Sequence, residues 1–368
     1  MKTMKTMKTM KTLYLPLLIL ALAFLPMVAS ADVIESVEID GIYYNLITKG
    51  NIAEVTYNPN GYSNISNLVI PATVTYNGLE YSVKKIADSA VPDGYWNGVF
   101  ANCNGLTSVT LPNSLTRIGK YAFAGCSGLT NFIIPDGVKE IGQAAFMMSS
   151  ITSVTIPSSV TKIENAAFRD CHRLTSIHIT DLLAWCRISF FDDDPYSTPP
   201  FAGTLGTDYT AYHLFLNGEE ITDLVIPNDI TTIGDNTFWG CVGLTSVTIP
   251  NSVNTIGKCA FYGCSGLNSV TIPNTITSIC SGAFQYCESL TSVHISDLEA
   301  WCKISFNSNP LSYAHHLFLN AVEIKDLIIP NSVTTINNYS FRNCSGLTSI
   351  TIPNSVTRIG NSAFEGCI

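Results

Sequence analysis

The sequence contains little charge and only one long apolar run. Asp, Glu, Lys and Arg together make up 13% of its 368 residues, with 28 acidic and 19 basic side chains. Nucleic-acid binding requires clustered Lys and Arg that displace counterions, and this sequence has no such cluster. The composition therefore argues against a nucleic acid as partner. It also provides no basic segment for adsorption to a membrane.

The sequence also lacks the common catalytic motifs. It contains no G-x-S-x-G, H-E-x-x-H, P-loop or G-x-G-x-x-G pattern. Asp192, Asp193 and Asp194 are consecutive, without the spaced oxygens and the glycine of a calcium loop. His315 and His316 have no Cys or Asp in phase with them that could complete a zinc site. We therefore predict that the protein is not an enzyme and holds neither a cofactor nor a metal.

The one long apolar run lies near the N-terminus. It spans Leu13–Val28, follows four lysines and ends in Ala-Ser-Ala at residue 31, the order of parts in a secretory signal peptide. A membrane anchor is the alternative, but the run is shorter than the roughly 20 residues needed to span a bilayer. It also contains Pro16 and Pro26. Cleavage after Ala31 removes four lysines and no acid, so the net charge changes from −9 to −13. We expect an exported mature chain that does not insert into the membrane.

Most of the chain is a repeat of 23 residues. Pro112 and Pro135 are 23 residues apart, whereas Pro157 follows after 22 because that unit is one residue shorter and lacks its Cys. The unit reads C-x-x-L-T-S-V-T-I-P-x-S-V-T-x-I-G-x-x-A-F-x-G, and a fixed period of this length is typical of a solenoid with one coil per repeat. The segment L-T-S-V-T-I alternates apolar and polar residues as a strand does, and proline ends it. Ten such strands begin at Leu106, Leu129, Ile151, Leu174, Ile221, Leu244, Leu267, Leu290, Ile324 and Leu347.

These strands predict one continuous parallel sheet about 45 Å long, at about 4.8 Å per strand. An eleventh strand is expected at residues 67–70, ahead of Pro71. We place a β-rich lead-in at residues 32–100 and the solenoid, about ten coils, at residues 101–368. The last coil ends at Ile368 with an apolar face and no polar cap, which indicates either a truncated reading of a longer protein or an end that seeks a partner.

Eight of the twelve cysteines occupy one position of the repeat, three residues after a phenylalanine. Side chains at this position in stacked coils lie about one strand spacing apart and point the same way, which does not suit a disulfide. We therefore predict buried free thiols. Cys259 and Cys280 fall outside this phase and are the two to test for reactivity. The eight are Cys103, Cys126, Cys171, Cys241, Cys264, Cys287, Cys344 and Cys367.

Two coils are expanded, at about residues 180–223 and 296–326. Both contain D-L-x-A-W-C-[RK]-I-S-F and then H-L-F-L-N, so the expansion is a second type of coil. Asp181 and Asp297 are natural N-caps for short helices, in which a Trp fills the core. Asn217-Gly218 between alternating residues predicts a hairpin in the first expansion.

The first expansion contains an acidic, proline-rich and aromatic insertion at residues 191–211. We expect it to project from the stack, where it is either a binding loop or a surface insertion without function. As a binding loop it would use Phe191, Asp192, Asp193, Asp194, Tyr196, Phe201 and Tyr209.

The outward position of the strands is the second candidate surface. A row of threonines is favoured by β-propensity alone, but the exposed sheet is also where solenoids bind partners. The candidate partner-binding residues at this position are Thr110, Thr155, His178, Thr248, Thr271, His294 and Thr351.

The repeat resembles the BspA-like, treponemal-type leucine-rich repeat family of bacterial cell-surface proteins. The similarity rests on strings such as LTSVTIPNSV, LTSITIPNSVTRIGNSAF and FYGCSGL and covers residues 101–368. Residues 40–90 are also similar to the β-rich lead-in of many members. The resemblance implies an exported, curved solenoid that acts by adhesion to a protein or glycan of a host or neighbouring cell. The alternative is a structural spacer with no ligand of its own.

Overall fold

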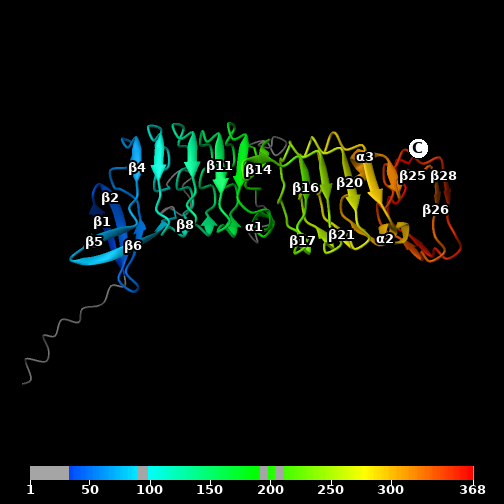
Figure 1. Cartoon of the computed structure of the whole chain (residues 1–368), viewed down its shortest axis with the longest axis horizontal. Helices are drawn as coiled ribbons and strands as arrows, with labels where there is room; N and C mark the ends of the chain where they lie inside the picture. The colour runs from blue at the N-terminus through cyan, green and yellow to red at the C-terminus, as the bar shows by residue number, and fades with distance from the viewer. Residues whose placement is uncertain (1–32, 89–97, 191–197, 204–210, 368) are drawn as a thin grey trace, which may run out of the picture.

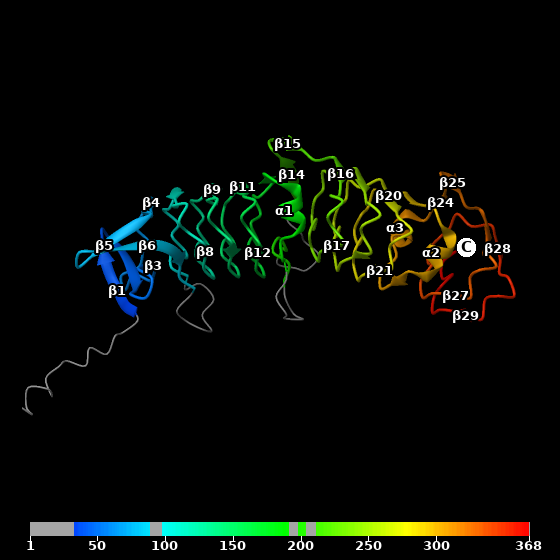
Figure 2. The ribbon, with the colours of Figure 1, turned by 60° about the horizontal axis from the view of Figure 1, so that its bottom comes forward.

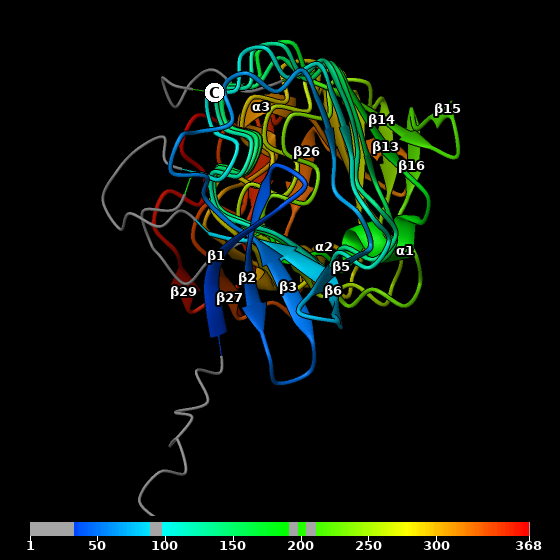
Figure 3. The ribbon, with the colours of Figure 1, turned by 90° about the vertical axis from the view of Figure 1, so that its left-hand side faces the viewer.

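The chain winds into one elongated stack of coils with a small β-rich unit at its N-terminal end (Figure 1). The structure is a computed structural model and describes residues 33–88, 98–190, 198–203 and 211–367. The expected signal peptide lies outside these residues. Viewed along the axis of the stack, successive coils superimpose on one another (Figure 3).

The predicted β-rich lead-in forms an open sheet that continues into the solenoid. Its strands β1, β2 and β3 are antiparallel, β3 pairs in parallel with β6, and β5 forms a hairpin with β6. Two pairings join the lead-in to the coils, β4 with β7 and β6 with β8. The expected eleventh strand is therefore present, as β4. The elements of the lead-in are β1 (Val33–Ile39), β2 (Ile42–Ile47), β3 (Ile52–Val55), β4 (Asn67–Val69), β5 (Thr73–Tyr76) and β6 (Leu79–Ile86).

All ten predicted repeat strands form and run parallel along one side of the stack (Figure 1). We call β4 and these ten strands, together with β14 and β24 described below, the face strands. The strands pair so that equivalent residues of neighbouring coils lie opposite each other; Val154 on β11, for example, lies opposite Ile177 on β13. The ten are β7 (Ser108–Thr110), β9 (Asn131–Ile133), β11 (Ser153–Ile156), β13 (Ser176–Ile179), β16 (Asp223–Val225), β18 (Ser246–Thr248), β20 (Ser269–Ile272), β22 (Ser292–Ile295), β26 (Asp326–Ile328) and β28 (Ser349–Thr351).

The prediction of one continuous face sheet is wrong. Each expanded coil adds a parallel strand, β14 (His213–Leu216) or β24 (Leu317–Leu319), which turns into an antiparallel strand, β15 (Glu219–Glu220) or β25 (Val322–Glu323). Because a hairpin strand then occupies the edge, the next face strand starts a new sheet. The two hairpins account for the breaks before β16 and β26, and a further break lies between β7 and β9, where no hairpin occurs. The face is divided into β4–β7, β9–β11–β13–β14–β15, β16–β18–β20–β22–β24–β25 and β26–β28.

A second row of short parallel strands, which the sequence did not predict, runs along another side of the stack (Figure 2). It consists of three sheets: β8, β10 and β12, which continue the lead-in sheet, then β17, β19, β21 and β23, then β27 and β29. Most of its strands come from the T-x-I segment after the proline, where the Ile is buried in every coil except the last, in which Ile359 is exposed. Only two residues per coil take part, too few for an alternating pattern to be recognised. These strands are β8 (Arg117–Ile118), β10 (Glu140–Ile141), β12 (Lys162–Ile163), β17 (Thr232–Ile233), β19 (Thr255–Ile256), β21 (Ser278–Ile279), β23 (Ser305–Phe306), β27 (Thr335–Ile336) and β29 (Arg358–Ile359).

Stacked phenylalanine rings run through the core between the face strands and the second row of strands. Rings of consecutive coils lie 5.1–5.6 Å apart at angles of 4–14°. The prediction that Phe201 belongs to an exposed binding loop is wrong, because this ring is fully buried and stacks on Phe168 at 5.3 Å. The expansion therefore supplies a phenylalanine to the same stack. Each coil buries its ring only against its neighbours, so stability comes from the contacts between coils.

The cysteines confirm the prediction of buried free thiols. All twelve are unpaired, and all eight in the repeat position are buried. The thiol of Cys264 donates to the carbonyl oxygen of Phe238 in the preceding coil at 3.2 Å, and Cys126 and Cys367 do the same with Phe100 and Phe341. Burial raises the pKa of Cys126 to about 12. It also raises the pKa of the out-of-phase Cys259 to about 11, which leaves little reactive thiolate at neutral pH.

The shortened coil keeps a residue in the cysteine position. Ser149 lies three residues after Phe146, is buried, and its hydroxyl contacts the thiol of Cys171 at 3.4 Å. What this coil lacks is one residue between that position and the strand.

The expanded coils form the predicted helices, α1 (Leu182–Cys186) and α2 (Leu298–Lys303), and the second also contains α3 (Leu311–Ala314). Asp181 and Asp297 cap the first two by accepting from the backbone nitrogen three residues on. Trp185 and Trp301 are buried, as predicted. The hairpin turn at Asn217-Gly218 also forms, with both residues at positive φ.

Candidate binding face

The predicted partner-binding residues lie on the outward side of the face strands. Four of the threonines, at positions 110, 248, 271 and 351, are exposed. Thr155, His178 and His294 are half-buried. Parallel register places Thr155 opposite His178 and Thr271 opposite His294, so these residues belong to one row across the stack.

Two histidines of this row stack on phenylalanines of the expanded coils. His178 on β13 lies opposite Phe215 on β14, with ring centroids 4.7 Å apart at 20°. His294 on β22 lies opposite Phe318 on β24, at 4.8 Å and 25°. All four side chains are partly exposed. We call these two contacts the aromatic pairs; they give an otherwise Ser- and Thr-rich face two aromatic patches of the same construction.

A histidine–glutamate contact accompanies each aromatic pair. His213 Nδ1 on β14 lies 2.5 Å from Glu220 Oε1 on β15, and His316 Nδ1, just before β24, lies 2.6 Å from Glu323 Oε1 on β25. Both contacts lie against a glycine of the next coil, where a Cβ would approach the glutamate oxygen to 2.2 Å at Gly243 or 2.9 Å at Gly346. Only a glycine at these two positions lets the following coil lie this close to the hairpin.

Apolar outward residues occur where a sheet segment begins. Val69, Ile133, Val225 and Ile328 occupy the position that is Thr or His on most other face strands, and each is 61–74% exposed. Their strands β4, β9, β16 and β26 are the first strands of the four segments of the face. The face thus combines aromatic pairs at the ends of segments with apolar residues at their beginnings.

The aromatic partners of the candidate histidines were not predicted from the sequence. Phe215 and Phe318 stand in the repeated string H-L-F-L-N, which was a visible signal, but only the register of β14 and β24 brings them opposite His178 and His294. Of the candidate loop, Phe191, Asp192, Asp193, Asp194, Tyr196 and Tyr209 lie outside the described residues.

The described residues show neither a metal cluster nor a membrane-spanning helix. No three His, Cys, Asp or Glu side chains within residues 33–88, 98–190, 198–203 and 211–367 gather as a metal site requires. The three described helices contain four to six residues, far fewer than a bilayer crossing needs.

Short parallel strands stacked on a leucine and phenylalanine core at a 23-residue spacing define a leucine-rich-repeat solenoid. The BspA type leucine rich repeat region matches residues 96–196, 210–315 and 312–368, and the chain belongs to this family. Solenoids of this family are typically non-enzymatic, and leucine-rich repeat proteins mediate protein interactions.

Two solved structures illustrate the likeness. A leucine-rich repeat protein from Bacteroides ovatus ATCC 8483 is 26% identical, with 90% of this chain and 92% of that chain covered and a TM-score of 0.42. A leucine rich cell surface protein from Faecalibacterium prausnitzii A2-165 is 24% identical, with coverage of 88% and 96% and a TM-score of 0.38. No curated protein sequence matches the chain significantly.

Proposed function

We propose that the protein is an exported cell-surface adhesin that binds a partner protein through the outward side of its face strands. The observation that carries this proposal is the duplicated aromatic pair on a face of small polar residues. Partly exposed rings supply apolar contact area with little loss of conformational freedom, which is why aromatic residues are enriched where proteins bind each other. The sparse charge of the surface also favours contact by shape and apolar area.

The expansions support this proposal because both place the same residues on the same face. A spacer without a ligand needs only coils that stack, and the ordinary 23-residue coil already does so. The expanded coils instead bring Phe215 and Phe318 to the surface beside His178 and His294. These surface rings contribute little to the core, so the stacking of coils does not explain them, whereas a role in binding does.

The proposal is tested with the chain from residue 32 and a panel of immobilised matrix and serum proteins. We expect saturable binding to at least one of them, weakened about tenfold or more in the double variant Phe215→Ala/Phe318→Ala, because loss of a central aromatic contact removes 1–3 kcal/mol or more. The matched control is Asn251→Ala/Asn274→Ala, two exposed side chains that follow Pro250 and Pro273 and lie outside the outward row, which should change the affinity less than about threefold. Thermal melting of each variant checks that the fold is kept.

Three results would contradict the proposal. Absence of saturable binding across the protein panel would favour the spacer, whereas saturable binding confined to a glycan array would identify a carbohydrate as the partner. Equal affinity of the parent and of the Phe215→Ala/Phe318→Ala variant would place the binding surface elsewhere.

A further inference from the structure

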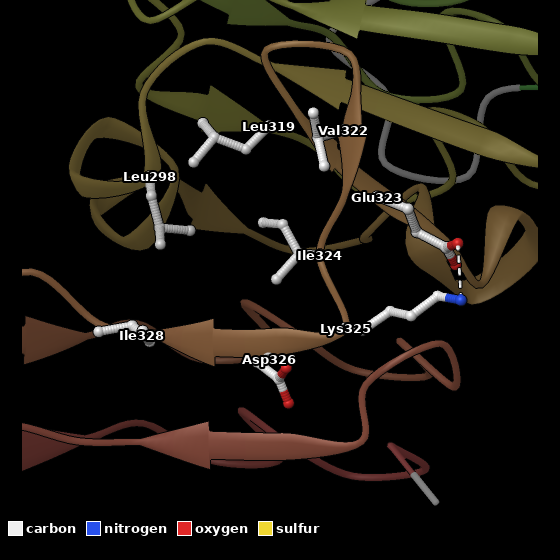
Figure 4. A pocket seen from close by; sticks show the side chains of 8 residues that line it. All are labelled: Leu298, Leu319, Val322, Glu323, Ile324, Lys325, Asp326 and Ile328. Atoms are coloured by element: carbon white, nitrogen blue, oxygen red, sulfur yellow. Dashed lines mark ion pairs between the residues drawn. The ribbon is translucent and has the colours of Figure 1, made fainter.

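The two expanded coils create two equivalent grooves. The first, of about 360 Å³, lies between the end of the β14–β15 hairpin, α1 and β16. The second, of about 420 Å³, lies between the β24–β25 hairpin, α2 and β26, and Figure 4 shows Leu298, Leu319 and Ile324 around it. Both volumes fall within the range of about 300–1,000 Å³ typical of ligand pockets. The lining residues correspond one to one, as Leu216 does to Leu319 and Val225 to Ile328.

Each groove lies along the edge of a sheet. Within the part of the chain that the structure describes, β16 pairs with β18 alone and β26 with β28 alone. The hairpin that precedes each strand projects away from the stack, as Figures 2 and 3 show for β15. An edge strand offers backbone donors and acceptors to another extended chain. The grooves are therefore places where a further strand could pair with the face.

The side chains beside these edges suit such a strand. Val225 on β16 is 61% exposed and Ile328 on β26 is 66% exposed, each turned outward at the edge. An added strand would place its own side chains next to them as a cross-strand pair, the contact that stabilises sheets. Leu182 and Leu216 in the first groove, and their equivalents in the second, provide apolar walls.

The two grooves differ in charge. Glu219, Glu220 and Asp223 line the first groove, and no basic residue does. In the second groove the corresponding residues are Val322, Glu323 and Asp326. Lys325 stands there in the place of Thr222, with its Nζ 4.0 Å from Glu323. An apolar and basic segment is complementary to the first groove and matches the second less well, because Lys325 offsets part of its negative charge.

We propose that an extended segment of a partner protein binds in the β16 groove and pairs with the edge of β16 as an additional strand. Apolar and basic side chains alternate along this segment. The β26 groove is a weaker second site for the same segment. This inference deepens the proposed function and rests on the partner being a protein. It assigns the expansions a specific role, since they open the face sheet where a strand can be added.

The experiment is selection of a random peptide display library on the chain from residue 32, with the variant Glu219→Lys/Val225→Lys as counter-selection. Both substituted side chains are exposed, so the fold should be kept. We expect enrichment of peptides in which Lys or Arg alternates with Val, Ile or Leu. A synthetic enriched peptide should bind the variant about tenfold or more weakly. The control Asn251→Lys/Asn274→Lys, at two exposed positions that do not line the groove, should stay within about threefold.

Amide hydrogen exchange with the synthetic peptide tests the mode of binding. Pairing with the edge should slow exchange at β16, whereas the amides of β20, in the middle of its sheet, should be unaffected. Failure to enrich any peptide, equal affinity for the Glu219→Lys/Val225→Lys variant, or unchanged exchange at β16 would each overturn the proposal. In the last two cases the charged residues would only be protecting an edge from aggregation. The aromatic pairs are tested by other variants, so failure here leaves the result for the binding face separate.

Discussion

At the scale of single residues, the cysteine of the repeat performs two functions that an alanine or a valine could not combine. Its side chain is a small apolar filler between stacked coils, and its thiol donates to a phenylalanine carbonyl of the preceding coil. Ser149 shows that the position accepts another small side chain with a donor. The requirement at this position is therefore a small volume together with one hydrogen-bond donor.

This requirement predicts an order of stabilities for variants at Cys264. Cys264→Ala should lower the free energy of unfolding by about 1–2 kcal/mol, since it leaves a small cavity and removes the donor to Phe238. Cys264→Ser should lower it by less, because the hydroxyl can keep the bond. Urea denaturation measures both, with the half-buried Cys280→Ala as the control at less than about 0.5 kcal/mol. A serine variant less stable than the alanine variant would refute the role of the donor.

At the scale of elements, the expanded coils are tied to the coils that follow by their tryptophans. Trp185 Nε1 donates to the carbonyl oxygen of Thr237 at 3.1 Å, and Trp301 Nε1 donates to that of Ser340 at 2.9 Å. Each bond is buried and joins residues 52 or 39 positions apart. Each tryptophan therefore fills the core, as the sequence predicted, and also fixes the position of its coil against the next.

We expect Trp185→Phe to lower the free energy of unfolding by about 1–3 kcal/mol, because the ring still fills most of the space but leaves the carbonyl of Thr237 without its partner. Trp301→Phe is the comparison variant and should lower the free energy of unfolding by less, because the carbonyl of Ser340 still accepts from Asn309 Nδ2 at 2.9 Å. Chemical denaturation with tyrosine fluorescence and circular dichroism as probes provides the measurement. If both variants kept the full stability of the parent, the bonds would have no measurable effect.

The sequence predicted the coils well and the breaks in the sheet poorly, for physical reasons. Proline, the T-I-P strand and the phased cysteine are local signals, so the ten strands and the buried thiols could be read directly. The break before β16 depends on β15, two glutamates with no strand pattern of their own, which pair only because the Asn217-Gly218 turn places them there. The outward threonines and histidines could be predicted from their position in the repeat. Phe215 could be placed beside His178 only from the pairing register of β13 and β14.

Phe201 was misplaced for a different reason. It lies in a proline-rich segment that reads as a surface loop, and its equivalence to the phenylalanines of the repeat is hidden by the insertion around it. Only the stack on Phe168 reveals that the segment returns to the core.

At the scale of the whole molecule, the buried thiols make stability depend on alkaline pH. Burial raises the pKa of Cys126, Cys171 and Cys287 to about 12 in the folded state from 9.0. A raised pKa contributes stability that is fully present below the unfolded value and is lost as the pH rises towards the folded value. The free energy of unfolding should therefore fall above about pH 9, by about 1–2 kcal/mol per thiol at pH 10.

Thermal melting from pH 7 to pH 10.5 measures this effect. Tyrosines with raised pKa values, such as Tyr62 at about 12, add to the same fall, so the decisive comparison is with the triple variant Cys126→Ser/Cys171→Ser/Cys287→Ser. This variant should melt lower at pH 7 but lose less of its melting temperature between pH 8 and pH 10.5. Parallel pH profiles for the parent and the variant would argue against the thiols as the source.

The tryptophan bonds have a consequence for how the chain folds. Coils of nearly identical sequence can stack on the wrong neighbour, displaced by one repeat, and lose little contact energy in doing so. The ordinary coils offer few features that distinguish the correct neighbour from the next one along. Trp185 finds the backbone oxygen of Thr237 only when its coil lies in its proper place, and Gly243 receives the His213–Glu220 contact only there. Slipped stacking would lose these contacts, so the expanded coils favour the correct neighbour. They also divide the repeats into shorter runs of similar coils, within which fewer incorrect pairings are possible.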